Sequence, residues 1–117
     1  MADKTFVVTV ASAGGNKYFI DGVQQATVMI GAGLTYKFDQ SDSSNATHPL
    51  RFSTTDDGTH SGGSEYTIGV TTNGTPGSSG AYTEISVQNG APSTLYYYCT
   101  NHGGMGGQAN TDGWGRS

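Results

Sequence analysis

A short stretch near the end of the chain gathers three side chains of the kind that bind metals. Residues 95–107 read LYYYCTNHGGMGG and hold Cys99, the only cysteine, together with His102 and Met105. Two imidazoles and a thiolate, with a distant thioether, form the ligand set of blue-copper sites. The second imidazole can come from His48, which stands just before an apolar segment. The sequence therefore predicts one metal site with four ligands: His48, Cys99, His102 and Met105.

The segments that carry these ligands show the alternation of β-strands, and no segment has a helical period. In residues 95–99, Leu95, Tyr97 and Cys99 share one face, so the thiol points the same way as core residues. We expect strands at residues 5–10, 17–20, 27–30, 34–39, 50–53, 66–71, 82–87 and 95–99, and residues 108–111 could add a last short strand. About seven or eight short strands with turn signals between them predict an all-β fold, an antiparallel Greek-key β-sandwich.

The domain organisation follows from length and composition. The 117 residues suffice for one domain, which we place at residues 1–111. Residues 112–117 form a short glycine-rich tail that carries Trp114, and either this tail or an edge strand could dock to a partner protein.

Strand ends that meet at one pole of such a sandwich would bring the ligands together. His48 lies where a polar loop meets a strand, and Cys99 ends a later strand. The glycines around Met105 would let the loop fold back, although they also predict a loop with little rigidity. Asn45 and Asn101 are candidate hydrogen-bond partners for the ligand segments, because outer residues orient metal ligands.

Two sets of sequence motifs resemble known protein families. The C-x-x-H-x-x-M run from Cys99 to Met105, with Tyr97 before it and His48 upstream, resembles the ligand loop of the cupredoxins and is most similar to that of the amicyanins. The stretches HPLRFSTTDDGTH, GTPGSSGAYTEISV and APSTLYYYCTNHGGMGGQAN resemble cupredoxin-like modules in structural proteins of marine bacteriophages. One departure is Pro49, where cupredoxins usually have a polar residue that ties the ligand loops together.

The resemblances imply copper as the cofactor, with an empty scaffold as the alternative, and two competing roles. The first role is a non-enzymatic virion module, such as a capsid decoration or cement protein or a tail-associated protein. Its partners would be other virion proteins such as the major capsid protein, its location the virion assembled in the host cytoplasm, and its copper site a stabilising or vestigial feature. The second role is a soluble blue-copper electron carrier with a redox partner protein. A homo-oligomer stays open in either case.

Composition and motifs argue against other classes of function. The net charge is −4 and the five Lys and Arg residues are scattered, which argues against nucleic acid and anionic membranes as partners. The first residues show no secretory signal or membrane segment, so we do not expect a periplasmic protein. There is no catalytic constellation, and a complete set of four ligands leaves no open position for a substrate. We therefore expect no enzyme.

Three groups of residues have alternative interpretations. His60, with Asp56 and Asp57 nearby, could form a separate hard-metal or zinc site, but we favour a solvated loop. Tyr96 and Tyr98 belong either to a partner surface or to the second face of their strand. Cys99 itself could be a buried and inert side chain, as free cysteines often are.

Overall fold

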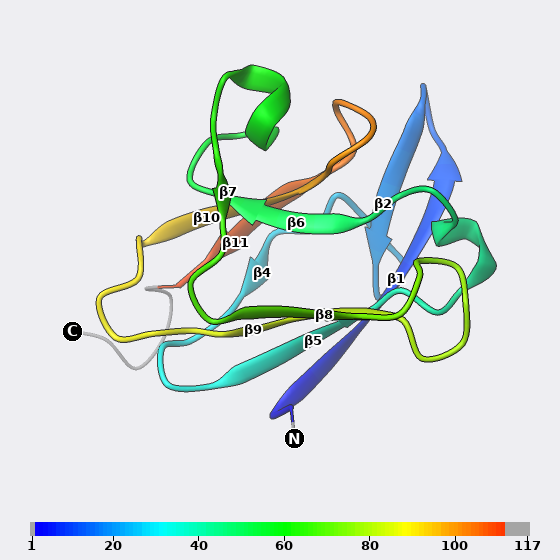
Figure 1. Ribbon diagram of the computed structural model, residues 1–117. Coiled ribbons are helices and arrows are strands. Elements are labelled where there is room, and N and C mark those ends of the chain that lie inside the picture. Colours follow the sequence, from blue (N-terminus) through cyan, green and yellow to red (C-terminus); the bar gives the residue numbers. More distant parts are fainter. Residues whose placement is uncertain (1, 112–117) are drawn as a thin grey trace.

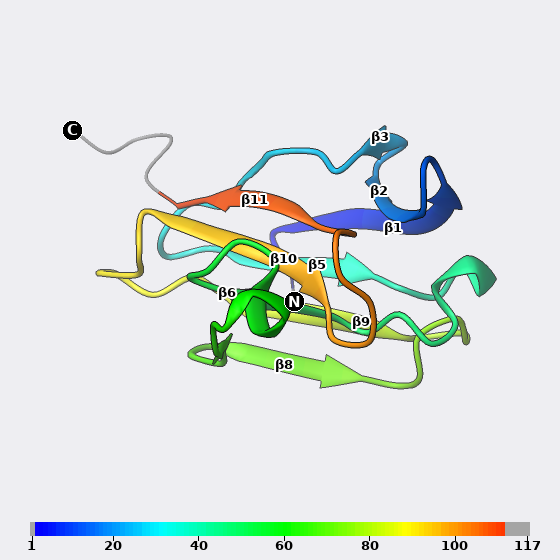
Figure 2. The same cartoon turned by 90° about the horizontal axis from the view of Figure 1, so that it is seen from above.

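The computed structural model describes residues 2–111, which form two β-sheets packed face to face, with two short 3-10 helices, η1 (Ser43–Asn45) and η2 (Gly58–Ser61). The six strands of the first sheet lie in the order β3 (Val23–Gln24), β2 (Asn16–Ile20), β1 (Lys4–Ser12), β5 (Thr35–Asp39), β9 (Tyr82–Ser86) and β8 (Val70–Asn73). The five strands of the second lie in the order β4 (Val28–Met29), β11 (Gly107–Asn110), β10 (Thr94–Cys99), β6 (Leu50–Ser53) and β7 (Glu65–Tyr66). Figures 1 and 2 show these two layers, and they confirm the predicted all-β sandwich.

The core lies between the layers and follows from alternation along the strands. Tyr36 and Phe38 of β5 face Leu50 and Phe52 of β6, and all four side chains are buried. The Phe38 and Phe52 rings meet edge to face with centroids 5.3 Å apart, a favoured arrangement of aromatic rings. Burying each such side chain contributes about 1.5–3 kcal/mol, so the aromatic pairs hold the two sheets together.

The strand pairing differs from the prediction in three ways. The described residues contain eleven strands, and two pairs are parallel rather than antiparallel, namely β1 with β5 and β11 with β4. The short strand β3 was not predicted. The strand expected at residues 66–71 is divided between the two sheets as β7 and β8. Gly69 explains the division, since its φ of 73° turns the chain and a Cβ there would collide with the Ser86 carbonyl.

The tail at residues 112–117, with Trp114, lies outside the described residues. Within residues 2–111, neither of the two helical turns has the length and apolar character that crossing a membrane requires.

Candidate metal centre

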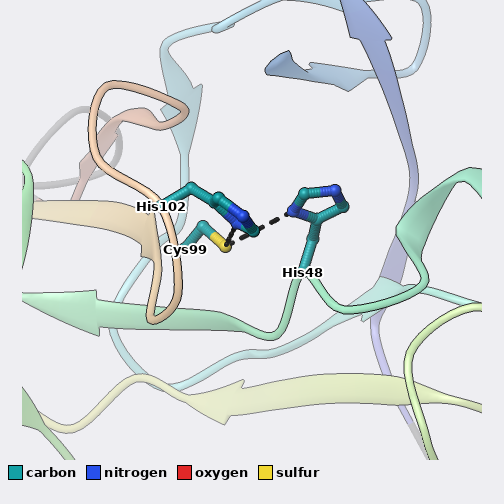
Figure 3. A group of neighbouring side chains, drawn as sticks. All are labelled: His48, Cys99 and His102. Carbon is teal, nitrogen blue, oxygen red and sulfur yellow. Dashed lines mark hydrogen bonds between the residues drawn. The ribbon is translucent and has the colours of Figure 1, made fainter.

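Three of the four predicted ligands lie together at one end of the sandwich. The Cys99 sulfur is 3.7 Å from Nδ1 of His48 and 3.7 Å from Nδ1 of His102. The three donor atoms lie within 4.8 Å of one another, and Figure 3 shows the side chains pointing toward one another. Among the described residues this is the one group of His, Cys, Asp or Glu side chains that could hold a metal ion.

The two sulfur–nitrogen distances match those around a shared metal ion. With metal–nitrogen bonds of about 2.0–2.1 Å and a metal–sulfur bond of about 2.3 Å, a trigonal or tetrahedral ion needs sulfur and nitrogen roughly 3.6–3.8 Å apart. Both measured sulfur–nitrogen distances are 3.7 Å. Imidazole suits zinc and copper, and thiolate suits zinc and copper(I). The residues therefore fit a borderline or soft metal ion, bound by two Nδ1 atoms and one sulfur.

The pairing of β10 with β6 brings the ligands from distant parts of the chain together. Cys99, the last residue of β10, pairs with Leu50, the first residue of the antiparallel strand β6. His48 precedes Leu50 by two residues and therefore lies beside the same strand end. His102 follows Cys99 in the loop toward β11. The expectation that the two strand ends meet at one pole is confirmed.

The backbone of His48 is held by buried hydrogen bonds. Its carbonyl accepts from the Tyr18 hydroxyl at 2.6 Å and from Nε2 of Gln40 at 2.7 Å. Gln40 also donates to Oδ1 of Asn45 at 3.0 Å and accepts from the Leu50 N–H at 3.0 Å. Asn45 therefore supports the ligand segment through Gln40, which is 1% exposed. Such outer residues fix the orientation of metal ligands.

The two ligand segments are also joined directly. Nδ2 of Asn101, between Cys99 and His102, donates to the carbonyl of Thr47 at 2.9 Å. This hydrogen bond joins the two ligand segments, which the side chain of Pro49 cannot do because it has no hydrogen-bonding group. Thr47 takes a φ of 69°, which is uncommon for a β-branched residue. Both asparagines named from the sequence thus make contacts to the ligand segments.

The glycine-rich loop after Cys99 is held by side chains from three other segments. Nζ of Lys17 donates to the Gly104 carbonyl at 2.9 Å, and Nε2 of Gln25 donates to the Gly106 carbonyl at 2.9 Å. The Gly104 N–H donates to Oδ1 of Asp57 at 2.9 Å. Glycine is required at position 106, because a Cβ there would collide with the Tyr97 carbonyl. The loop is therefore anchored, which a count of its glycines did not predict.

The fourth predicted ligand lies in the core. Met105 is 1% exposed and belongs to the same cluster of buried residues as Cys99. Its carbonyl accepts from the N–H of Tyr18 at 3.0 Å. Tyr18 thus contacts both ligand segments, since its hydroxyl donates to His48. The axial role of the Met105 sulfur stays a prediction.

The surroundings of the site favour the uncharged form of His48. Burial lowers the pKa of the His48 imidazole below its ordinary value, and the nearby His102 adds to this effect. Burial, followed by the charge of Cys99, raises the pKa of Tyr18 well above its ordinary value, so its hydroxyl stays protonated and donates. A neutral imidazole is the form that binds a metal ion, and the site therefore favours the ligating state of His48.

This shift predicts how the stability of the metal-free protein depends on pH. The folded state binds a proton on His48 less readily than the unfolded state, whose histidines titrate near about 6.5. As the pH falls through this value the unfolded chain takes up the proton first, so the free energy of unfolding decreases until the lower folded pKa is passed. Urea unfolding between pH 8 and pH 5, with a chelator present, would measure this decrease. The His48→Gln variant should lack this component, and an equal pH dependence in both proteins would contradict the assignment.

Several residues that support the site were not predicted from the sequence. Lys17, Tyr18 and Gln25 carry no local pattern that marks them, because they act across the sandwich. Gln40 did carry a signal. It continues the alternation of Tyr36 and Phe38 on the buried face, where a polar side chain needs hydrogen-bond partners.

His60 does not form a separate metal group with Asp56 and Asp57 among the described residues. Its ring nitrogen lies 2.7 Å from the Cys99 carbonyl instead.

Comparison of the chain with known protein families and with curated proteins finds no match.

Proposed function

We propose that this protein binds one copper ion in a cupredoxin-like site formed by four residues: His48, Cys99, His102 and Met105. The observation that carries the proposal is the pair of equal 3.7 Å distances from the Cys99 sulfur to the two Nδ1 atoms. A thiolate with two imidazoles favours copper over hard cations, and a thioether completes the blue-copper set. Four protein ligands leave no open position for a substrate, which supports a role without catalysis.

The role we propose for the protein is a structural module of a bacteriophage virion. Support comes from the stretches that resemble phage structural proteins, among them residues 91–110, which contain the ligand loop. The metal would then stabilise the fold, since an ion bound only by the folded state shifts the folding equilibrium toward it. His48 precedes β6, whereas Cys99 ends β10 and His102 follows it, so a bound ion would link the two strand ends. The partner would be a shell protein such as the major capsid protein.

A second candidate function is one-electron transfer. His102 is exposed, whereas His48 and Cys99 are buried. An exposed ligand ring gives an electron a short route between a buried metal and a partner protein. The net charge of −4 would favour a basic partner through electrostatic steering.

A copper titration followed by visible absorption tests the metal site. We expect an intense charge-transfer band that saturates at one copper per chain, because a thiolate bound to copper(II) absorbs strongly. The Cys99→Ser variant should show no such band while keeping the fold, which far-ultraviolet circular dichroism checks. Absence of the band in the parent protein, with no change of its unfolding temperature on adding copper or zinc, would contradict the proposal.

A further inference from the structure

Residues 54–63, which lie in the connection between β6 and β7, contact the ligand loop at two places. Nε2 of His60 lies 2.7 Å from the Cys99 carbonyl oxygen. Because a carbonyl only accepts, this nitrogen carries the proton and donates. Three residues earlier, Oδ1 of Asp57 accepts from the Gly104 N–H at 2.9 Å. In Figures 1 and 2 the helical turn η2 of this segment lies near the loop between β10 and β11. One short segment therefore binds the loop that carries His102 on both sides of that residue, at Cys99 and at Gly104.

The segment is built to lie against β10. Asp57 and Gly58 both take left-handed backbone conformations, with φ of 65° and 55°, and this sharp turn starts η2. A Cβ at Gly58 would lie 2.6 Å from the Tyr98 ring, so glycine lets the turn sit directly on that ring. The His60 ring meets Tyr98 edge-on at 6.3 Å. Tyr98 is 1% exposed as a result, so this residue packs on the second face of its strand.

The contacts of the segment act on the backbone of the predicted ligand Cys99 and of Gly104, which precedes the predicted ligand Met105. His60 binds the carbonyl of the residue whose sulfur is the predicted ligand, and so limits rotation of the backbone at Cys99. The backbone of Gly104 is held from two sides, at its N–H by Asp57 and at its carbonyl by Lys17. If a bound ion left by movement of this loop, the movement would break the hydrogen bonds from His60 and Asp57.

We infer that residues 54–63 form a clasp on the ligand loop, in which His60 and Asp57 are positioning residues that hold Cys99 and Gly104 and slow the release of the metal ion. The part of the inference that concerns metal release rests on the proposed copper site. Removing an outer hydrogen-bond partner of a metal ligand typically weakens binding about 10- to 100-fold. The clasp therefore predicts faster release without loss of the ligands themselves.

Matched variants separate the hydrogen bond from the packing of His60. His60→Leu removes the donor, whereas His60→Gln keeps an N–H near the position of Nε2. Release of copper to an excess of chelator, followed by the decay of the visible band, should be about tenfold faster in His60→Leu and about the parent rate in His60→Gln. Asp57→Gly removes the carboxylate and suits the left-handed backbone, and Asp56→Asn serves as its control, because Asp56 is exposed.

Amide hydrogen exchange in the metal-free protein tests the clasp independently of copper. The Gly104 amide should exchange about tenfold faster in Asp57→Gly and also faster in His60→Leu, but not in Asp56→Asn, with the global unfolding free energy little changed. If the parent protein binds no copper, the proposed function fails, and the exchange rates still test the clasp. Unchanged Gly104 exchange in both clasp variants would overturn the inference. So would release from His60→Gln as fast as from His60→Leu.

Discussion

Replacing Gln40 by leucine is expected to lower the free energy of unfolding of the metal-free protein by about 4 kcal/mol. The side chain is 1% exposed and makes three hydrogen bonds, to the His48 carbonyl, the Leu50 N–H and Oδ1 of Asn45. Leucine has a similar volume but leaves the last two groups buried without this partner, and each such loss costs about 1–3 kcal/mol. Urea unfolding followed by circular dichroism measures the change.

Tyr18→Phe is the matched control for this prediction. It removes a hydroxyl that donates to the same His48 carbonyl at 2.6 Å. That carbonyl keeps its bond from Gln40, and we therefore expect a loss of only about 1 kcal/mol. Equal losses in the two variants would show that Gln40 does not link its three partners as the structure indicates. Copper binding should weaken more in Gln40→Leu, because this variant removes one of the two hydrogen bonds to the His48 carbonyl and also the partner of the Leu50 N–H.

The sandwich could be predicted from the sequence because its signals are local. The alternation of Tyr36 and Phe38 with polar residues fixes which face of β5 is buried, whatever the neighbouring strands are. The division of residues 66–71 between two sheets depends instead on Gly69. Its carbonyl accepts from the Ser86 N–H of β9, and a Cβ at this position would collide with the Ser86 carbonyl. The parallel pairing of β1 with β5 is likewise set by the packing of distant segments.

The candidate site likewise has parts that the local sequence predicts and parts that depend on packing between distant segments. Cys99 and His102 share one short run with a known chemical meaning, and His48 could be found as the histidine beside a second strand. Their meeting is set by one register, Cys99 opposite Leu50. The clasp could not be found in this way, since Asp57 and His60 lie in a polar loop whose composition predicts only exposure to solvent. Their contacts to Gly104 and Cys99 depend on the packing of Gly58, in the same loop, against the Tyr98 ring of β10.

Binding of copper is expected to raise the free energy of unfolding by about 4 kcal/mol at a free copper concentration 1,000 times the dissociation constant, if the ion binds only the folded state. The reason lies in the position of the donors. His48 precedes β6 and Cys99 ends β10, so the complete ligand set exists only when these strands are paired. Thermal unfolding at increasing copper concentrations measures the gain, and the slope against the logarithm of concentration gives the number of ions bound.

His102→Ala is the variant that isolates this effect. Because His102 is exposed, its removal should leave the metal-free protein almost as stable as the parent, whereas Cys99→Ser changes a fully buried side chain. The copper-induced gain should fall strongly in His102→Ala, since one of the donors is lost. A parent protein that shows the blue band but gains no stability would contradict a stabilising role for the metal. Electron transfer through the exposed His102 would then be the better explanation of the site.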